Sequence, residues 1–320
     1  MNILFHLHAY PNEVLAGAET MAHRIAKYLQ SVGHSVKVYS QTAKEPRKFV
    51  DNIEVLRFES GTDDSENWKW ADLVFTHLGA TYYCLNKSRW YSKKLVHLIH
   101  NSFGDHLVSV RVKNNFLVYN SEYVKRVLKY EHPSCICIPP VDYREYQNVK
   151  PKGNYITLVN LNENKGGQIL IELAKRLPQY QFLGVTGGYY DQIKEKLPNL
   201  KYIEPQSNIK VAYEQSKIVI MPSEYESYGQ VAIEAISCGI PVISSKAQGL
   251  VEALSYAGTP IDRTDLNAWC EAIIKLMSDN EYYKRKSLES LKRAKELDPL
   301  NYLNGLNDFL TQIYKISWQE

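Results

Sequence analysis

The segment of residues 216–243, SKIVIMPSEYESYGQVAIEAISCGIPVI, constrains the fold more than any other part of the chain. Its first apolar run, Ile218–Met221, has the composition of a strand that is buried on both faces of a parallel sheet. The apolar spacing over Gln230–Cys238 is helical, and a Gly and a Pro then end the helix. A second apolar run, Pro241–Ile243, follows. The segment therefore predicts a strand, a helix and a parallel strand, the unit from which α/β domains are built.

Two carboxylates in this segment suggest a ligand site. Glu226 lies in the loop after the first strand, at the edge where parallel sheets bind ligands, so it could accept hydrogen bonds from sugar hydroxyls. Glu234 lies among Ala, Ile and Val, where a carboxylate is unfavourable unless donors satisfy it, and the vicinal hydroxyls of a ribose could do so. The alternative is that Glu234 is capped or paired within the protein and that Glu226 is solvated. These two residues alone leave both interpretations open.

The residues around the two carboxylates form a longer pattern. Seven residues separate the Glu pair, which lies between Pro-Ser and Gly-x-Pro-Val. This pattern closely resembles the retaining glycosyltransferases of family 4 (glycosyl transferases group 1), which have the GT-B fold. The resemblance implies that Glu226 binds the transferred sugar and takes part in catalysis, and that Glu234 holds the ribose of the donor. It also implies that Tyr228, Gly229 and Gln230 lie against the donor.

The second half of the chain contains one more donor motif. An apolar run at Tyr155–Val159 predicts a strand, and a polar loop over Asn160–Gln168 follows it. In this loop Lys165 and Gly166 match the Lys-Gly of the family, which implies a catalytic cation for the donor diphosphate. The family commonly has an Arg where this chain has Asn160, an uncharged residue that can still donate a hydrogen bond.

The first half of the chain offers two more candidates. Gly17 opens a predicted helix over Ala18–Leu29, and a Gly there lets a phosphate approach the helix N-terminus closely. It matches the second Gly of a Gly-Gly-Ala-Glu motif in the family, with Ala16 in place of the first. His100 ends the predicted strand Leu95–Ile99, and it matches a histidine that the family places against the donor sugar and the acceptor. The alternatives are an ordinary loop glycine and a structural histidine.

The length and composition fit two α/β domains. At 320 residues the chain can bury two cores. We predict a Rossmann-like, doubly wound acceptor-side domain at residues 1–145 and a nucleotide-sugar-binding domain at 146–320, which face each other across a cleft. The last predicted helix, at about 301–316, would cross back to the first domain, as in GT-B enzymes. No run approaches ~18 apolar residues, and the first residues lack the pattern of a signal peptide.

Charge and cysteine content limit the partners and the compartment. Residues 1–140 hold 17 Lys and Arg against 13 Asp and Glu, so an anionic partner other than the donor would meet this half. Basic and aromatic residues alternate at 82–94, which could contact a membrane surface or nucleic acid, although a solvated helix face is commoner. Five scattered cysteines predict a reduced, cytoplasmic protein, which could lie at the inner membrane face. Cys135 and Cys137 point the same way along a strand, and a core role is favoured over a metal site.

Together these features predict an enzyme that moves a sugar from a nucleoside-diphosphate-sugar, most often a UDP- or GDP-sugar, to an acceptor hydroxyl. The acceptor would be a glycan, a lipid-linked molecule or a small molecule, and the resemblance implies an α-glycoside product. The resemblance also implies a metal-independent reaction, and the sequence shows no Asp-x-Asp metal motif or other cofactor site. Three alternatives remain open: a transferase for a modified DNA base, a sugar-nucleotide-binding protein without turnover, and a GT-B epimerase.

Overall fold

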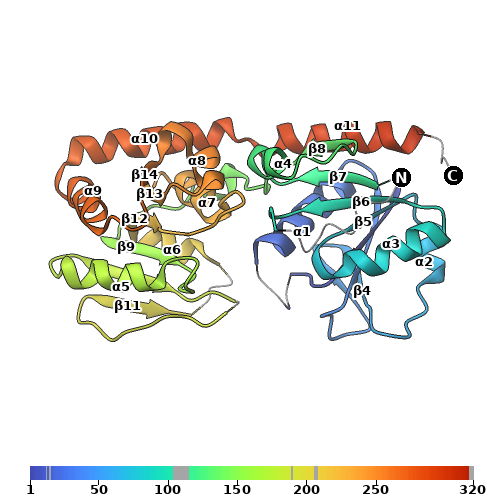
Figure 1. Ribbon diagram of the computed structural model, residues 1–320, viewed down its shortest axis with the longest axis horizontal. Coiled ribbons are helices and arrows are strands. Elements are labelled where there is room, and N and C mark those ends of the chain that lie inside the picture. The colour runs from blue at the N-terminus through green and yellow to red at the C-terminus, as the bar shows by residue number, and fades with distance from the viewer. Residues whose placement is uncertain (12, 14–15, 104–114, 189, 205–207, 317–320) are drawn as a thin grey trace. The chain divides into compact units, whose positions relative to one another are not determined.

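The computed structural model describes residues 1–11, 13, 16–103, 115–188, 190–204 and 208–316. The chain divides into two compact units (Figure 1). The first consists of Met1–Pro140 together with the residues from Pro299 onward, and the second is Val141–Asp298. The helix α11 (Pro299–Lys315) therefore belongs to the first unit although it ends the chain. Each unit contains a sheet with helices on it, as the sequence predicts for α/β domains.

The first unit is built on an eight-stranded sheet in the order β3-β4-β2-β1-β5-β6-β7-β8. The strands are β1 (Asn2–Leu7), β2 (Ser35–Ser40), β3 (Arg47–Val50), β4 (Ile53–Arg57), β5 (Leu73–Thr76), β6 (Lys94–Ile99), β7 (Asn115–Tyr119) and β8 (Ser134–Ile136). The helices are α1 (Gly17–Ser31), α2 (Ser65–Trp70), α3 (Thr81–Trp90), α4 (Glu122–Leu128) and α11, with a short 3-10 turn at Leu78–Ala80. All pairs are parallel except β3 with β4. The strand order reverses between β1 and β5, where doubly wound folds bind ligands.

The antiparallel β3–β4 hairpin is a feature that our sequence analysis missed. Val50 pairs with Ile53, so two residues make the turn. These are Asp51 and Asn52, with φ of 49° and 65°. Positive φ at both positions is the requirement of a type I′ hairpin, and Asp and Asn tolerate it better than most residues. The sequence signal was therefore present in this Asp-Asn pair.

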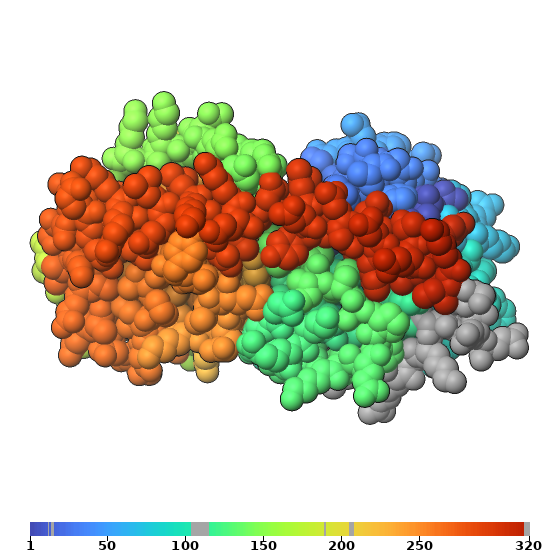
Figure 2. Space-filling model, turned by 90° about the horizontal axis from the view of Figure 1, so that it is seen from above, coloured from blue at the N-terminus to red at the C-terminus, as the bar shows by residue number. Residues whose placement is uncertain are grey.

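Helices cover both faces of the first sheet. Alternate residues of β1 point to opposite sides: Phe5 packs against Phe75 and the residues of α1, whereas Leu4 packs in a second cluster with Trp68 of α2. The helix α11 adds Leu303, Leu306, Leu310 and Ile313 to the same cluster as Phe5. In Figure 2 the residues of α11, in red, lie at the surface against blue and green residues of the first unit. Burial of these four side chains holds α11 on the first unit.

The second unit has a six-stranded parallel sheet in the order β11-β10-β9-β12-β13-β14. The strands are β9 (Tyr155–Val159), β10 (Gln181–Val185), β11 (Leu200–Ile203), β12 (Ser216–Met221), β13 (Val242–Ser245) and β14 (Thr259–Ile261). The helices are α5 (Gly167–Arg176), α6 (Lys210–Gln215), α7 (Gln230–Ser237), α8 (Gln248–Leu254), α9 (Leu266–Ser278) and α10 (Asn280–Glu296), with 3-10 turns at Tyr143–Tyr146 and Ser255–Ala257. The strand order reverses between β9 and β12, so the loops after these two strands meet at one edge of the sheet.

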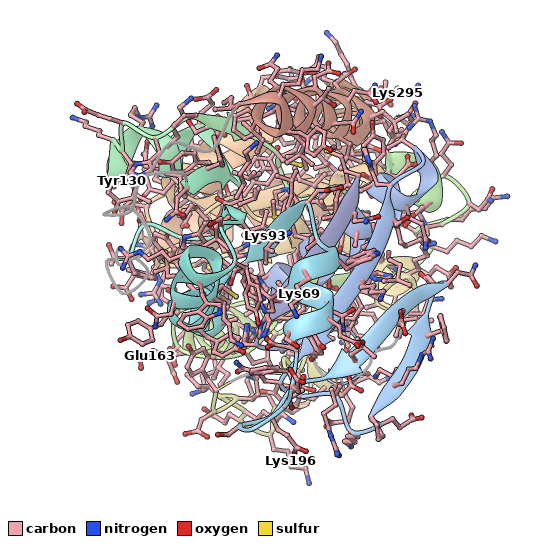
Figure 3. The ribbon with its side chains drawn as sticks, turned by 90° about the vertical axis from the view of Figure 1, so that its right-hand side faces the viewer. Lys69, Lys93, Tyr130, Glu163, Lys196 and Lys295 are labelled. Atoms are coloured by element: carbon pink, nitrogen blue, oxygen red, sulfur yellow. The ribbon has the colours of Figure 1, made fainter. Side chains whose placement is uncertain are left out.

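Three of the four basic residues of the stretch 82–94 are engaged within the first unit. Lys87 of α3 donates to Asp64 Oδ1 at 2.8 Å. Lys93 Nζ donates to the backbone oxygens of Lys69 and Ala71, at 3.0 and 2.6 Å, and Figure 3 labels both lysines. Lys94 Nζ donates to the backbone oxygen of a residue in α11. This stretch is therefore a packed helix and turn, although Tyr82 and Trp90 of α3 are exposed. Among the described residues, no helix is both long and apolar enough to cross a membrane.

Cys135 and Cys137, the two cysteines considered as a possible metal site, lie in apolar surroundings. Cys137 is fully buried in the first core, and Cys135 packs against it. Burial raises the pKa of the Cys135 thiol to about 12 and that of Cys137 higher still. Both thiols are therefore protonated near neutral pH and serve the core.

A buried carboxylate joins α2 to α3. Asp64 is 1% exposed. It accepts hydrogen bonds from Trp68 Nε1 at 2.7 Å, the Tyr83 hydroxyl at 2.6 Å and Lys87 Nζ at 2.8 Å. Three donors, one of them charged, satisfy this carboxylate and offset its loss of hydration.

We predict that Asp64→Ala lowers the free energy of unfolding by about 3 kcal/mol, because it leaves three donors, including a partly buried ammonium, without their acceptor. Urea unfolding followed by tryptophan fluorescence measures the change. Asp63→Ala is the matched control: Asp63 is exposed and bonds locally to the Ser65 backbone N–H, so less than about 1 kcal/mol should be lost. Equal losses in the two variants would contradict this account of Asp64.

Candidate functional site

Two predicted catalytic residues meet at the edge of the second sheet. Lys165 lies in the loop between β9 and α5, and Glu226 lies in the loop between β12 and α7. Since β9 and β12 are parallel neighbours, both loops leave the sheet at its carboxyl edge. Lys165 Nζ forms an ion pair with Glu226 Oε1, and Ser223 Oγ donates to the same oxygen at 3.1 Å. The Lys and Glu side chains are 25% and 11% exposed, so solvent reaches both charges.

Two residues that the sequence analysis missed hold these loops together. Asn164 Oδ1 accepts from the backbone N–H of Tyr225 at 3.1 Å, which ties one loop to the other. Arg263 donates from Nε to the Pro222 backbone oxygen at 2.8 Å and from Nη2 to the Glu163 backbone oxygen at 2.9 Å. Arg263 lies beyond β14, far along the chain from either loop, and no local sequence pattern marks it. The loops are therefore braced by contacts that depend on the tertiary fold.

The two helices that follow these loops, α5 and α7, are each preceded by a glycine in the left-handed region. Gly166 has φ of 90° and precedes α5, and Gly229 has φ of 105° and precedes α7. A Cβ at Gly166 would lie 2.6 Å from Pro222 Cγ. The first turn of a helix presents N–H groups that lack intrahelical acceptors and carries a partial positive charge. Two such turns beside Lys165 make this edge suitable for an anion.

A third glycine lies directly against the backbone of the Glu226 loop. Gly249 lies in α8, and a Cβ there would be 2.3 Å from the Glu226 backbone oxygen and 2.5 Å from the Ser227 carbonyl carbon. Real Cβ atoms do not approach backbone so closely, so only Gly fits under this loop. The sequence analysis assigned no role to Gly249.

The second carboxylate of the motif is satisfied within the protein. Glu234, on α7, is 6% exposed. Its Oε2 accepts from the Tyr213 hydroxyl at 2.8 Å, and its Oε1 accepts from Gln230 Nε2 at 2.9 Å. Tyr213 is fully buried, and burial together with the Glu234 charge raises its pKa well above the usual value, so it remains a donor. The sequence analysis did not identify Tyr213. The pairing accounts for a carboxylate among apolar neighbours, and the ribose contact stays a prediction.

The other two predicted donor residues of this unit lie in different surroundings. Tyr228 is buried, 2% exposed, just before Gly229. Asn160 follows β9 with φ of 69°, a conformation that Asn adopts more readily than most residues. Its Oδ1 accepts from Gln192 Nε2 at 3.1 Å, and a Cβ at Gly187 would lie 2.4 Å from its Cγ. The Asn160 carboxamide is thus packed against neighbouring loops of the second unit.

Gly17 and His100 belong to the first unit, whereas the other eight predicted residues belong to the second. Gly17 is the exposed first residue of α1. His100 follows β6, is 9% exposed, and has its Nε2 2.9 Å from Nδ1 of His77. The Asn120 side chain donates to the His100 backbone oxygen at 2.9 Å. The structure therefore places His100 in a histidine pair at the carboxyl edge of the first sheet.

Comparison with known proteins finds a family match in the second unit and solved structures with a similar fold. Residues 142–294 match the family model described as Glycosyl transferases group 1. D-inositol 3-phosphate glycosyltransferase of Corynebacterium jeikeium is 30% identical over 143 residues, which cover 38% of this chain and 34% of that protein. The chain thus spans about a third of the length of this curated relative.

Two solved structures resemble the chain along almost its whole length. Sucrose-phosphate synthase from Thermosynechococcus elongatus has a TM-score of 0.82 at 16% identity, with 99% of this chain and 100% of that chain covered. Anabaena HepE in complex with UDP-glucose has a TM-score of 0.81 at 16% identity, with 98% and 100% covered. These likenesses confirm the predicted GT-B fold, and the part of the chain that is similar to the glycosyl transferases group 1 family is the second unit.

We predict that Gly249→Ala destabilises the protein by about 2 kcal/mol, because the new methyl group would displace the backbone at Glu226. Gly305→Ala provides a matched control with the opposite sign. Gly305 is also helical, and nothing lies within 4 Å of the position of its Cβ, so Ala should stabilise α11 by up to about 1 kcal/mol. Thermal and urea unfolding measure both changes. A Gly249→Ala protein as stable as the wild type would contradict the close approach of α8 to the Glu226 loop.

Proposed function

We propose that this protein is a retaining glycosyltransferase that moves a sugar from a nucleoside-diphosphate-sugar to an acceptor hydroxyl. The observation that carries the proposal is the Lys165–Glu226 pair beside the starts of α5 and α7. It lies in the unit that matches the glycosyl transferases group 1 family. A cation, two helix N-termini and a carboxylate at one sheet edge supply the charges and acceptors that a sugar diphosphate requires.

In this proposal the diphosphate lies against Lys165 and the first turns of α5 and α7. The charge on the departing phosphate grows as the glycosidic bond breaks, and fixed positive groups stabilise that charge. Lys165 already contacts Glu226, so a bound diphosphate would share its ammonium group with this carboxylate. Glu226 would then accept hydrogen bonds from the hydroxyls of the transferred sugar, which couples sugar binding to phosphate binding.

Glu234 can hold the ribose without losing its present partners. An ionised carboxylate offers about four lone-pair positions, and Tyr213 and Gln230 occupy one on each oxygen. The remaining positions could accept the two ribose hydroxyls. Anabaena HepE, which shares the fold, was solved in complex with UDP-glucose. This supports UDP as the first nucleotide to test, with GDP next.

For the reaction we favour attack of the acceptor oxygen on the anomeric carbon from the same face as that from which the leaving group departs. The bond from the anomeric carbon to the phosphate oxygen breaks, and a bond from the same carbon to the acceptor oxygen forms. The acceptor proton moves to the departing phosphate oxygen, so no enzyme nucleophile is required and the anomeric configuration is retained. His100, at the carboxyl edge of the first sheet, would contact the donor sugar and the acceptor. This mechanism is metal-independent.

A second candidate is a protein that binds a sugar nucleotide without transferring the sugar. The favouring observation is Asn160, which takes the place of an Arg in the resembled family and has its carboxamide engaged by Gln192. Less positive charge near the diphosphate would weaken stabilisation of the leaving group more than binding of the donor. Donor binding without transfer to any acceptor and without donor hydrolysis would favour this candidate.

We predict that Lys165→Ala and Glu226→Ala each lower the rate of sugar transfer or donor hydrolysis by about 100-fold or more. Turnover of UDP- and GDP-sugars, followed by nucleotide release, measures the effect. Lys175→Ala is the control, because Lys175 forms an ion pair on α5 away from this edge and should leave the rate unchanged. Near-normal rates in both site variants would overturn the site assignment.

The stereochemistry gives an independent prediction. An α-linked donor should give an α-linked product, which the coupling constant of the anomeric proton reports by NMR. A β-linked product from the same donor would contradict retention, but it would not contradict the assignment of the donor site.

A further inference from the structure

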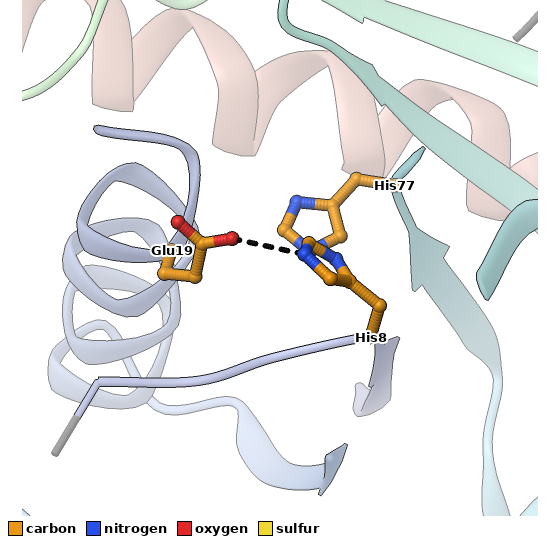
Figure 4. Close-up of side chains that lie close together, drawn as sticks. All are labelled: His8, Glu19 and His77. Atoms are coloured by element: carbon orange, nitrogen blue, oxygen red, sulfur yellow. Dashed lines mark ion pairs between the residues drawn. The ribbon is translucent and has the colours of Figure 1, made fainter. Parts of the chain in front are cut away.

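Three side chains of types that can bind a metal ion lie close together at the carboxyl edge of the first sheet. His8 follows β1, His77 follows β5, and Glu19 lies in the first turn of α1 (Figure 4). Since β1 and β5 are neighbours at the point where the strand order reverses, their ends bring the two histidines together. The His8 Nε2 atom is 3.2 Å from Glu19 Oε1. One ligand atom from each of the three residues lies within 4.8 Å of the other two.

The carboxylate of Glu19 is only partly satisfied by the residues around it, although it lies in the first turn of α1, where a negative charge is favoured. The side chain is 2% exposed. Its Oε2 is buried and accepts no hydrogen bond from the described residues, and the same is true of Nδ1 of His8. Its ion-pair partner in the described part of the chain is His8, which carries a charge only when protonated. A buried carboxylate with one weakly basic partner is costly, and a dication would satisfy it.

The donor set fits one class of metal. Two imidazoles and one carboxylate are the ligands of many zinc sites that keep a fourth position open, and they also suit Co²⁺. With tetrahedral geometry and zinc–ligand distances of about 2.0–2.2 Å, two ligand atoms lie about 3.3–3.6 Å apart. The three ligand atoms, which now lie within 4.8 Å of one another, would have to close by up to about 1.5 Å through rotation of their side chains.

A fourth residue fits the outer shell of such a site. A metal-binding histidine usually gives its other ring N–H to an acceptor, which fixes its tautomer. His77 has its Nδ1 2.9 Å from Nε2 of His100, so Nε2 of His77 would be the metal ligand. His100 Nε2 would then be an acceptor, and the proton of His100 would lie on its Nδ1.

We propose that His8, Glu19 and His77 form a binding site for a divalent metal ion of the zinc class, with His100 orienting His77. The site differs from the sequence expectation that no metal is bound, which considered Asp-x-Asp motifs and the cysteines. It does not depend on the glycosyltransferase proposal, whose reaction requires no metal. Its consequence for the first unit is that metal occupancy fixes the orientation and tautomer of His100.

The test uses the full, untagged chain after removal of metal by a chelator. Titration with Co²⁺ should produce the visible absorption of a low-symmetry, four-coordinate ion, saturating at one equivalent and reversed by Zn²⁺. Dialysis against Zn²⁺ followed by elemental analysis should retain one zinc per chain. Glu19→Gln and His8→Ala should each weaken Co²⁺ binding by about 100-fold, whereas His132→Ala, at a histidine outside this cluster, should not.

Two results would overturn the proposal. One is a chelator-treated chain that binds less than a stoichiometric amount of Co²⁺ or Zn²⁺ while its circular dichroism remains that of a folded protein. The other is an unchanged affinity for Co²⁺ in the Glu19→Gln variant. Gln has nearly the same shape as Glu, so this variant should fold like the wild type and its affinity reports on the carboxylate alone. Either result would leave His8 and Glu19 as a pair within the protein that holds no metal ion. Neither result depends on sugar transfer, so both are separable from failure of the proposed function.

Discussion

The ion pair between Lys165 and Glu226 is the contact on which the candidate site of the second unit depends. It forms because β9 and β12 are parallel neighbours, so the loops after them leave the sheet at the same edge. The helix after each loop starts close to this contact and is preceded by a glycine at positive φ. One carboxylate and one ammonium group are thus held beside two helix N-termini. The proposed donor chemistry is a consequence of this arrangement.

The same geometric rule acts in the first unit with different residues. There the strands β1, β5 and β6 end side by side, and a histidine follows each of them: His8, His77 and His100. Glu19 reaches this edge from the helix after β1. The second unit therefore gathers fixed positive charge, whereas the first gathers groups that can bind a metal or move a proton. In both units the reversal of strand order brings together residues that are far apart in the sequence.

The sequence predicted the features that depend on local pattern, and it missed those that depend on strand neighbours. The strand at Tyr155–Val159, the helix from Gln230 and the GT-B fold were predicted, because apolar periodicity and the Glu-x7-Glu context are local signals. Lys165 and Glu226 were identified separately, but their contact follows from strand order, which no local pattern specifies. For the same reason Tyr213, Arg263 and the His8–Glu19 pair were missed. The β3–β4 hairpin is different, since the turn residues Asp51 and Asn52 carried a readable signal.

The central claim is that the second unit binds a nucleoside diphosphate at the Lys165–Glu226 edge. The most direct measurement is thermal unfolding of the full chain with UDP, GDP, ADP, CDP and dTDP, repeated with Lys165→Ala and with the control Lys175→Ala. Saturation with one nucleotide should raise the Tm in the wild type and in Lys175→Ala, since a ligand at about 100 times its Kd adds about 2.7 kcal/mol of stability. Lys165→Ala should lose most of this shift. If no nucleotide stabilises the wild type, or if Lys165→Ala responds as the wild type does, the account of this site is wrong.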